Sequence, residues 1–275
     1  MNGIAIVGCG YVGTHTARLW GKQGYRLTAT TRNPEELDEL SKIAQRSTVI
    51  KGNDEDEFIP LIANHDTILI TIAADSPEHY ESAYLNTAQI FRRLALGMNT
   101  PRKIIYVSST SIYGDHHGLW VDESSLLKAS SPIAKILIDA EKTYLSLDEI
   151  GWNVCILRFA EIYGPNRELS SRLKQLEGHV LPGSGDHFTN MIHRDDCSGA
   201  IDFALRHDLE GVFNVVDDDH PLRKELYDAI AIKHKLKPIL WNPSLTGLHS
   251  GNKRISNHKI KSEGFSLIHP HRILD

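Results

Sequence analysis

The sequence predicts an α/β protein: a doubly wound parallel sheet of the Rossmann type with a smaller C-terminal lobe. Three observations predict this class. Short β-branched, apolar runs alternate with longer amphipathic stretches along most of the chain. A glycine-rich turn, Gly8-Cys9-Gly10-Tyr11-Val12-Gly13, follows the first of these runs. From about residue 164 onward, prolines and glycines divide the chain into shorter elements.

The expected strands are runs of β-branched and aliphatic residues at Ile4–Val7, Leu27–Thr31, Thr48–Lys51, Thr67–Ile72, Lys103–Val107, Asn153–Phe159 and Val212–Val216. Several of them are almost continuously apolar, which is typical of strands covered by helices on both faces. Helices are expected near 12–23, 34–45, 78–97, 131–149 and 195–206. We expect a dinucleotide-binding domain over 1–164 and a substrate lobe over 165–275. The domains interleave, because the strand at 212–216 returns to the main sheet.

Composition excludes several classes of function. The chain has 275 residues, of which 41% are hydrophobic and 24% charged, and its net charge is -5. This acidic balance, without a block of Lys and Arg, argues against nucleic acid or an anionic membrane as partner. The longest apolar run, Thr67 to Ala74, is too short to span a bilayer, and no secretory signal opens the chain. The scattered cysteines Cys9, Cys155 and Cys197 predict neither a disulfide framework nor a metal site. A cytoplasmic protein with a small-molecule substrate is expected.

The glycine turn predicts a pyrophosphate site. Gly8 permits a tight turn, Gly10 lets the backbone approach the phosphates, and Gly13 lets the following helix pack close to the strand. The amino end of that helix then offers unpaired N–H groups and the positive end of its dipole to the phosphates. Cys9, inside the turn, is interpreted as a small filler side chain.

The end of the second strand indicates which dinucleotide is bound. NAD sites usually place Asp or Glu there, to accept hydrogen bonds from the ribose 2′-hydroxyl. This chain has Thr30-Thr31-Arg32-Asn33, and its first carboxylate after the strand is Glu35. An Arg guanidinium pairs with a 2′-phosphate, whereas a carboxylate repels it. The sequence therefore favours NADP(H) over NAD.

Several segments together resemble the extended short-chain dehydrogenases, the NAD-dependent epimerase/dehydratase family, over nearly the whole chain. They are Asp66–Ala74 with its Ala-Ala, Asn86 in the next helix, Val107–Gly114, Leu157–Pro165 (similar to R-x-x-x-I-Y-G-P) and Ile192–Asp196 (similar to I-H-x-D-D). Asn214–Asp218 and Lys253–Asn257 resemble the closing elements of a bacterial subgroup, the YeeZ-like proteins.

The resemblance and the turn together define the expected site. The cofactor-binding residues are Gly8, Gly10, Tyr11, Val12, Gly13, Thr31, Arg32, Asn53, Ala73, Ala74 and Ser108. The resemblance also implies a homodimer formed through the helices around 78–97 and 131–149. Family members act on small substrates through a Tyr-x-x-x-Lys pair on one helix, assisted by a Ser, and here Ser109 falls in the serine position.

The tyrosine of that pair is missing. If Lys135 is the family lysine, its tyrosine position is Ser131; if the helix is aligned on Glu141, the two positions become Ile133 and Leu137. Ser131-Pro132 is instead a helix-start signature, with Ser as N-cap and Pro at the first helical position. The helix therefore begins where the catalytic tyrosine would lie.

Several groups could replace the missing tyrosine as the acid. The candidate catalytic residues are Ser109, Lys135 and Tyr113, and a water could donate the proton instead of Tyr113. Tyr163 occupies a similar I-Y-G turn, and His187 and His193 flank the expected mouth of the site. His116 and His117, next to Asp115, could suggest a metal site. Adjacent histidines in a turn rarely both face one ion, however, and no further ligand follows at metal-binding spacing.

Two functional hypotheses follow. The favoured one is an NADP(H)-dependent oxidoreductase or epimerase acting on a small polar or sugar-derived substrate. The alternative is a cofactor-binding sensor or scaffold without turnover, which the absent tyrosine supports.

Overall fold

The computed structural model describes residues 3–50, 54–98, 100, 102–129, 131–245 and 251–275. The chain forms two compact units, each built from three segments. Unit 1 comprises Met1–Ile112, Ala129–Arg158 and Ser198–Phe213, and unit 2 comprises Tyr113–Lys128, Phe159–Cys197 and Asn214–Asp275. The boundary expected between residues 164 and 165 lies inside unit 2, because the chain passes between the units several times.

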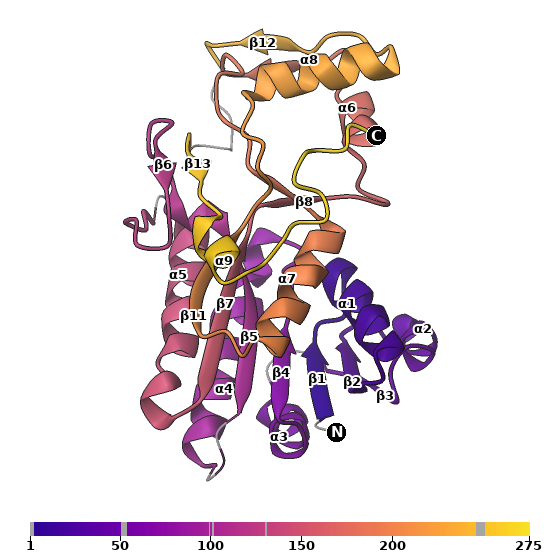
Figure 1. The fold of residues 1–275 in the computed structure, drawn as a ribbon, viewed down its shortest axis with the longest axis vertical. Helices are drawn as coiled ribbons and strands as arrows, with labels where there is room; N and C mark the ends of the chain where they lie inside the picture. The colour runs from indigo at the N-terminus through magenta and orange to yellow at the C-terminus, as the bar shows by residue number, and fades with distance from the viewer. Residues whose placement is uncertain (1–2, 51–53, 99, 101, 130, 246–250) are drawn as a thin grey trace. The chain divides into compact units, whose positions relative to one another are not determined.

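The main sheet has seven strands in the order β11-β7-β5-β4-β1-β2-β3 (Figure 1). Their bounds are β1 (Gly3–Val7), β2 (Arg26–Thr31), β3 (Arg46–Val49), β4 (Thr67–Ile70), β5 (Lys103–Ser109), β7 (Asn153–Phe159) and β11 (Gly211–Val215). Every one of the expected runs is a strand of this parallel sheet. The strand order reverses at β1, where Ile4 pairs with Leu27 of β2 on one side and with Thr67 of β4 on the other. Ligands bind at the carboxyl ends of strands beside such a reversal.

Helices cover both faces of the sheet. The α-helices of the Rossmann part are α1 (Tyr11–Lys22), α2 (Leu37–Ser41), α3 (Glu55–Asn64), α4 (Thr87–Leu96), α5 (Pro132–Leu145) and α7 (Arg194–Arg206). α1 and α7 lie together on one face, since Trp20 Nε1 donates to Asp202 Oδ1 at 3.0 Å. Their neighbours on the other face are α3, α4 and α5, which pack against each other in that order.

The helices of the structure differ from the expected ones near residues 78–97 and 55–64. The stretch near 78–97 is divided into a 3₁₀ turn (Pro77–His79), a π-helical segment (Glu81–Asn86) and α4. α3 was not anticipated, because Pro60 interrupts its pattern. Asp54 caps this helix by accepting from the amide of Asp56 at 3.0 Å, and a stripe of Phe58, Leu61 and Ile62 buries it against the sheet.

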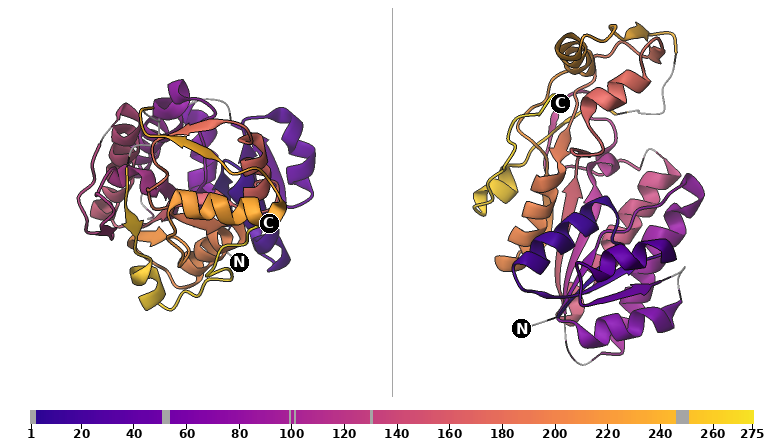
Figure 2. Two further views of the ribbon diagram at one scale, coloured as in Figure 1. Left: turned by 90° about the horizontal axis from the view of Figure 1, so that it is seen from above. Right: turned by 90° about the vertical axis from the view of Figure 1, so that its right-hand side faces the viewer.

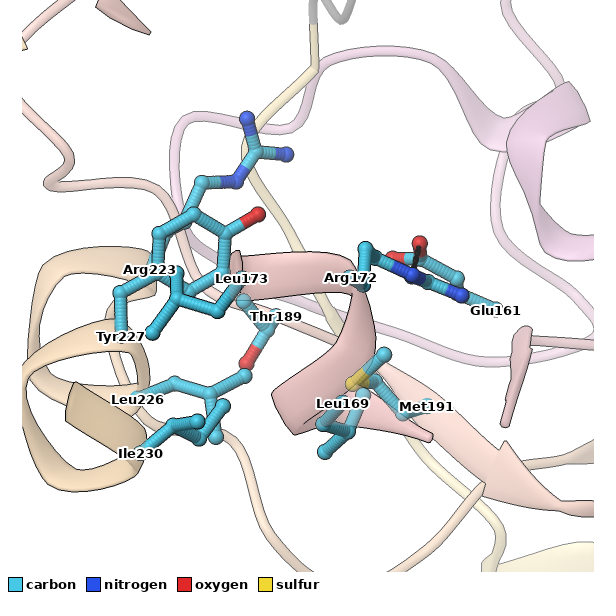
Figure 3. Close-up of a pocket in the computed structure, with 10 residues that line it drawn as sticks. All are labelled: Glu161, Leu169, Arg172, Leu173, Thr189, Met191, Arg223, Leu226, Tyr227 and Ile230. Atoms are coloured by element: carbon cyan, nitrogen blue, oxygen red, sulfur yellow. Dashed lines mark hydrogen bonds and ion pairs between the residues drawn. The ribbon is translucent and has the colours of Figure 1, made fainter. Parts of the chain in front are cut away.

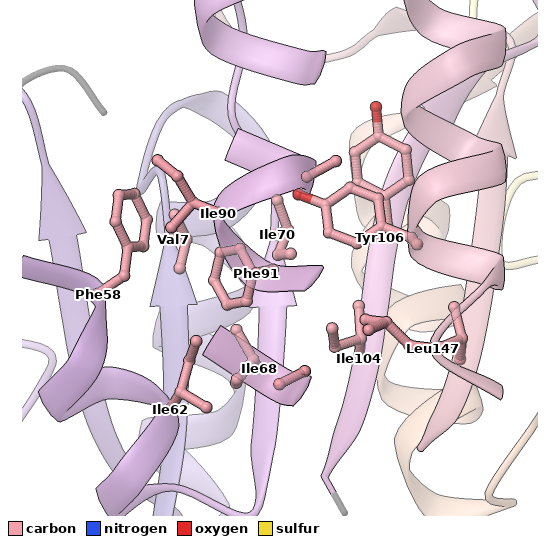
Figure 4. Close-up of a cluster of buried hydrophobic side chains, with 14 of the residues drawn as sticks. Val7, Phe58, Ile62, Ile68, Ile70, Ile90, Phe91, Ile104, Tyr106 and Leu147 are labelled. Atoms are coloured by element: carbon pink, nitrogen blue, oxygen red, sulfur yellow. The ribbon is translucent and has the colours of Figure 1, made fainter. Parts of the chain in front are cut away.

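The principal core lies between the sheet and α3, α4 and α5 (Figure 4). Aliphatic side chains of the strands, such as Ile68 and Ile104, meet Phe91 of α4 and Leu147, which follows α5. Phe58 and Phe91 pack edge to face with their ring centroids 5.4 Å apart. Because the core fills one whole face of the sheet, it fixes the strand ends on which the site is built.

Unit 2 is made of short parallel strand pairs and small helices (Figure 2). The pairs are β8 (Glu161–Tyr163) with β10 (Met191–His193), β9 (Val180–Pro182) with β12 (Leu240–Asn242), and β6 (Trp120–Val121) with β13 (Arg254–Ile255). Its helices are α6 (Leu169–Gln175), α8 (Arg223–His234) and α9 (His258–Ser262). A second core of residues such as Leu173, Met191, Leu226 and Ile230 joins α6, α8 and β10. Among the described residues, no helix is long and apolar enough to cross a membrane.

Candidate functional site

The glycine turn connects β1 to α1 at the strand-order reversal. Hydrogen bonds from Cys9 N to Thr30 O (2.8 Å) and from Gly8 N to Thr30 Oγ1 (3.1 Å) tie it to the end of β2. Gly8 has a φ of +88°, and a Cβ there would lie 2.8 Å from Ile72 Cα. Both conformation and space therefore require glycine, as the sequence predicts.

Gly10 and Gly13 serve different purposes. A Cβ on Gly13 would lie 2.5 Å from Thr71 Oγ1 and 2.7 Å from Gly8 O, so close packing of α1 against the strand ends depends on this glycine. A Cβ on Gly10 would meet no atom within 4 Å. Gly10 is the N-cap of α1 and has no side chain to occupy the first N–H groups of the helix. This open face, beside the amino end of a helix, is suited to an anion such as a pyrophosphate.

Cys9 is enclosed within the turn. Its side chain is buried, and burial raises the pKa of the thiol to about 12. A thiol with this pKa is protonated at neutral pH and is a poor nucleophile. The residue therefore fills space, as the sequence indicates.

The end of β2 carries an acidic group that the sequence analysis missed. Thr31 Oγ1 donates to Glu36 Oε2 at 2.5 Å, and Asn33 N donates to Thr31 Oγ1 at 3.1 Å. A 3₁₀ turn, Pro34–Glu36, brings this carboxylate back to the strand end. The Asn-Pro-Glu-Glu sequence, which is typical of a capped helical turn, is the signal that could have located it.

Arg32 is already paired with an acidic side chain. Its Nη2 lies 3.2 Å from Asp75 Oδ2, and both side chains are about half exposed. The other oxygen of Asp75 lies 2.6 Å from His79 Nδ1. The hydrogen bond with His79, more than the charge of Arg32, lowers the pKa of Asp75. The carboxylate therefore stays ionised beside the guanidinium.

The remaining expected cofactor residues lie at the ends of β4 and β5. Ala73 and Ala74 follow β4, and Ala74 N donates to the hydroxyl of Tyr84 at 3.4 Å. Ser108 is buried near the end of β5, and its Oγ has no hydrogen-bond partner among the described residues. Asn53 lies outside the described residues.

Ser109 ends β5 and takes part in a serine pair. Its Oγ donates to Ser111 Oγ at 2.9 Å and accepts from Ser111 N at 3.2 Å. The side chain is therefore oriented by the following turn.

The helix that should carry the Tyr–Lys pair begins as predicted. Ser131 is the N-cap of α5, its Oγ accepts from Ala134 N at 3.1 Å, and Pro132 follows at the first helical position. Lys135 is 70% exposed, and its Nζ lies 2.6 Å from Asp139 Oδ2 on the same helix. In the other alignment, Leu137 is buried in the core. If Lys135 is the family lysine, the tyrosine position falls on this helix cap.

The structure places Tyr113, the candidate acid, inside the fold of unit 2. Tyr113 is completely buried within unit 2, and its hydroxyl donates to Asn214 Oδ1 at 2.8 Å. Tyr163 is also buried: its hydroxyl accepts from Ile273 N at 3.2 Å, and burial raises its pKa to about 12. Both hydroxyl groups therefore form hydrogen bonds inside unit 2.

A small pocket of about 20 Å³ lies within unit 2 (Figure 3). Its apolar wall comes from α6, α8 and β10, with Leu173, Met191 and Leu226 among the lining side chains. Figure 3 shows Arg172 facing Glu161 at one end, where the two form an ion pair, and Arg223 beside Tyr227 at the other. A pocket of this size has room for about one water molecule.

Comparison with known proteins shows to which family this chain belongs. The sequence profile of the NAD dependent epimerase/dehydratase family matches residues 4–215, which include the glycine turn, Ser109, α5 and all seven strands of the main sheet. The chain belongs to the NAD-dependent epimerase/dehydratase family. Family membership accounts for the sheet order and for the glycine turn between β1 and α1.

Relatives of this family member span its whole length. Protein YeeZ of Escherichia coli K12 is 30% identical over 98% of this chain and 97% of its own. A protein of unknown function from Silicibacter pomeroyi has a similar structure, with a TM-score of 0.80 and 24% identity over 98% of this chain and 95% of that one. MoeE5 in complex with UDP-glucuronic acid and NAD is similar in fold, with a TM-score of 0.78 and 19% identity over 97% and 94% of the two chains.

Proposed function

We propose that this protein is a nicotinamide-dinucleotide-dependent oxidoreductase or epimerase acting on a small, sugar-derived substrate. The observation that carries the proposal is the open face at Gly10, beside the amino end of α1 and at the reversal of strand order. The backbone around Gly10 and Gly13 would hold the pyrophosphate, and Thr31, Arg32, Ala73, Ala74 and Ser108 lie at neighbouring strand ends. When bound, the nicotinamide supplies a hydride donor or acceptor.

We propose NADP(H) as the preferred form, with Arg32 as the partner of the 2′-phosphate. Because Arg32 is paired with Asp75, binding of the phosphate requires that Asp75 be displaced from the guanidinium. Glu36, on Thr31, is placed to accept a ribose hydroxyl and so favours NAD instead. The preference is therefore set by competition between a cation and two carboxylates.

This competition can be measured with single variants. Fluorescence titration with NADPH and NADH should show weaker NADPH binding in Arg32→Ala and tighter NADPH binding in Asp75→Asn, since the guanidinium is then released. Glu36→Gln should weaken NADH binding only. Equal affinity of the unmodified protein for both cofactors, or an Arg32→Ala variant that binds NADPH normally, would exclude the NADP(H) preference.

The proposed substrate class rests on the family and on a structural neighbour of similar fold that is solved with UDP-glucuronic acid and NAD. Ser109 is the hydroxyl we propose to orient the reacting oxygen of the substrate, with Lys135 exposed on α5 to contact the nicotinamide ribose. Since Tyr113 is buried and engaged by Asn214, we assign the proton transfer to a water. We further propose a cytoplasmic homodimer, as the family resemblance and the composition imply.

The alternative is a cofactor-binding sensor or scaffold without turnover, and one observation favours it: Ser131 caps α5 at the position of the family tyrosine. Nicotinamide absorbance measured over a panel of sugar nucleotides and carbonyl compounds separates the two. The enzyme hypothesis expects oxidation or reduction with at least one compound and its loss in Ser109→Ala. Tight cofactor binding without any turnover, unchanged by Ser109→Ala, would support the sensor.

A further inference from the structure

Three metal-ligating side chains from separate segments meet within unit 2. His193 ends β10, Asp195 lies in the first turn of α7, and His269 belongs to the C-terminal segment. One potential ligand atom from each lies within 4.8 Å of the others. Asp195 Oδ2 is central: it lies 3.6 Å from His193 Nδ1 and 3.5 Å from His269 Nε2.

These separations suit a small divalent cation. Zinc binds histidine nitrogen and carboxylate oxygen at about 2.0–2.2 Å in tetrahedral sites, so its ligand atoms lie roughly 3.4 Å apart. The distances from Asp195 Oδ2 to the two imidazoles match this edge length without a change of backbone. The two rings are themselves in contact, with centroids 4.0 Å apart.

The imidazoles present the lone pairs that a metal requires. Asp195 N donates to His193 Nδ1 at 3.2 Å, so the lone pair of this nitrogen is directed toward Asp195, and a metal bound there would take the place of the amide hydrogen bond. His269 Nε2 is buried and has no hydrogen-bond partner among the described residues. A buried polar atom in this position needs a partner.

Neighbouring side chains hold the segment of His269 and the carboxylate of Asp195 in place. The carboxylate of Asp196, which is fully buried, accepts the amides of Ile268 at 2.5 Å and of His269 at 3.0 Å. The guanidinium of Arg194 lies 3.8 Å from Asp195 Oδ1, the oxygen that faces away from the pair of imidazoles, and leaves Oδ2 as the ligand. Support of this kind orients the ligands of established metal sites.

We propose that His193, Asp195 and His269 form a three-ligand site for a divalent first-row transition metal of the zinc type. Two imidazoles and one carboxylate, with Asp195 partly exposed, leave a fourth position for water. The bound metal would fasten the C-terminal segment to the beginning of α7. None of its residues is among the cofactor-binding residues or the candidate catalytic residues Ser109, Lys135 and Tyr113 named above, so its test does not depend on the proposed oxidoreductase activity.

Cobalt substitution tests the proposal. The full chain, without an affinity tag, is treated with a chelator, dialysed and titrated with Co²⁺, which gives intense visible bands in tetrahedral sites. We expect the bands to saturate at one equivalent. The affinity should fall more than tenfold in His269→Gln and in Asp195→Asn. His271→Gln, a matched control two residues away on the same segment, should bind as the unmodified protein does.

Thermal unfolding gives a second measurement. Saturating Zn²⁺ should raise the Tm of the unmodified protein and of His271→Gln, but not that of His269→Gln or Asp195→Asn, because only the folded state with all three ligands binds the metal. Absence of saturable Co²⁺ bands overturns the proposal and leaves a hydrogen-bonded His–Asp–His cluster. Equal binding by His269→Gln and the unmodified protein overturns it as well. If His269→Gln is unfolded by circular dichroism, the unmodified protein and Asp195→Asn decide the outcome.

Discussion

Arg158 of β7 and Glu141 of α5 form a buried ion pair. Arg158 Nε donates to both carboxylate oxygens of Glu141, at 3.0 and 3.2 Å, and its Nη2 donates to Oε2 at 2.6 Å. The side chains are 5% and 2% exposed. The pair fixes the helix that begins with Ser131 and carries Lys135 against the sheet that carries the cofactor turn. It therefore links the two halves of the candidate site within unit 1.

Removing one partner of this pair should be costly. Arg158→Met leaves an uncompensated buried carboxylate, and we expect the free energy of unfolding to fall by about 3–5 kcal/mol. The double variant Arg158→Met/Glu141→Leu should recover most of that loss, because neither charge then remains buried. Urea unfolding of the three proteins measures this.

The matched control for this pair is the exposed ion pair of Lys42 and Glu39. Lys42→Ala should leave the unfolding midpoint unchanged, because exposed ion pairs contribute little. A loss below about 1 kcal/mol in Arg158→Met would contradict the buried-pair argument.

Gly10→Ala and Gly13→Ala should separate binding from folding. Gly10→Ala adds a methyl group to open space and should leave stability nearly unchanged. The methyl should nevertheless lower dinucleotide affinity by about tenfold, ~1.4 kcal/mol, because it occupies the face offered to the pyrophosphate. Gly13→Ala forces a contact with Thr71 and Gly8 and should cost about 1–3 kcal/mol of stability.

Cofactor titration and thermal unfolding of both variants test this assignment. Normal cofactor binding by Gly10→Ala would show that the pyrophosphate does not use this face. An unchanged Tm for Gly13→Ala would show that the helix can move away from the strand ends at little cost.

The conformations of the glycine turn and of the α5 cap were predictable because their signals are local. The apolar run of β1, the spacing of Gly8, Gly10 and Gly13, and the Ser131-Pro132 cap each specify a conformation over a few residues. The main sheet was predictable for the same reason. Each of its strands is a short β-branched run between turn signals.

Contacts between distant residues were not predictable. Asp75 reaches Arg32 through a loop, and His269 reaches His193 through tertiary packing of the C-terminal segment. The burial of Tyr113 depends on Asn214, far along the chain, so its turn sequence alone left it available as an acid. Pro60 concealed α3, whose stability comes from packing on the sheet.

The cap of α5 gives a prediction about the missing tyrosine. Ser131→Ala removes the acceptor of the Ala134 amide and should cost about 1 kcal/mol, whereas Ser131→Asp should preserve stability. Ser131→Tyr restores the family residue in sequence, but at an N-cap with extended backbone, φ -150° and ψ 160°. We expect it to lose stability as Ser131→Ala does and to gain no turnover. Chemical unfolding and the nicotinamide assay measure the two effects, and a rise in turnover in Ser131→Tyr would show that the helix can rebuild the family site.

His220 should make unit 2 sensitive to acid. Its Nδ1 is 3.1 Å from Asn190 Oδ1, and the ring packs edge to face on Trp120. Burial lowers the pKa of His220 to about 4; the charges of Arg272 and Arg254 add to this effect, and those of Asp218 and Asp219 oppose it. In the unfolded chain the pKa of a histidine is about 6.5.

Between these values the unfolded chain takes up a proton that the folded chain does not. Stability therefore falls as the pH falls from about 6.5 toward 4. At pH 5 the contribution of His220 is a loss of about 2 kcal/mol. His220→Gln, which can keep a hydrogen bond to Asn190, should reduce the loss of stability between pH 7 and pH 5 by that amount. His117→Gln, at a side chain that is 82% exposed, should not change it. Urea unfolding at both pH values measures the difference, and an identical pH dependence in His220→Gln and the unmodified protein would rule out His220 as its source.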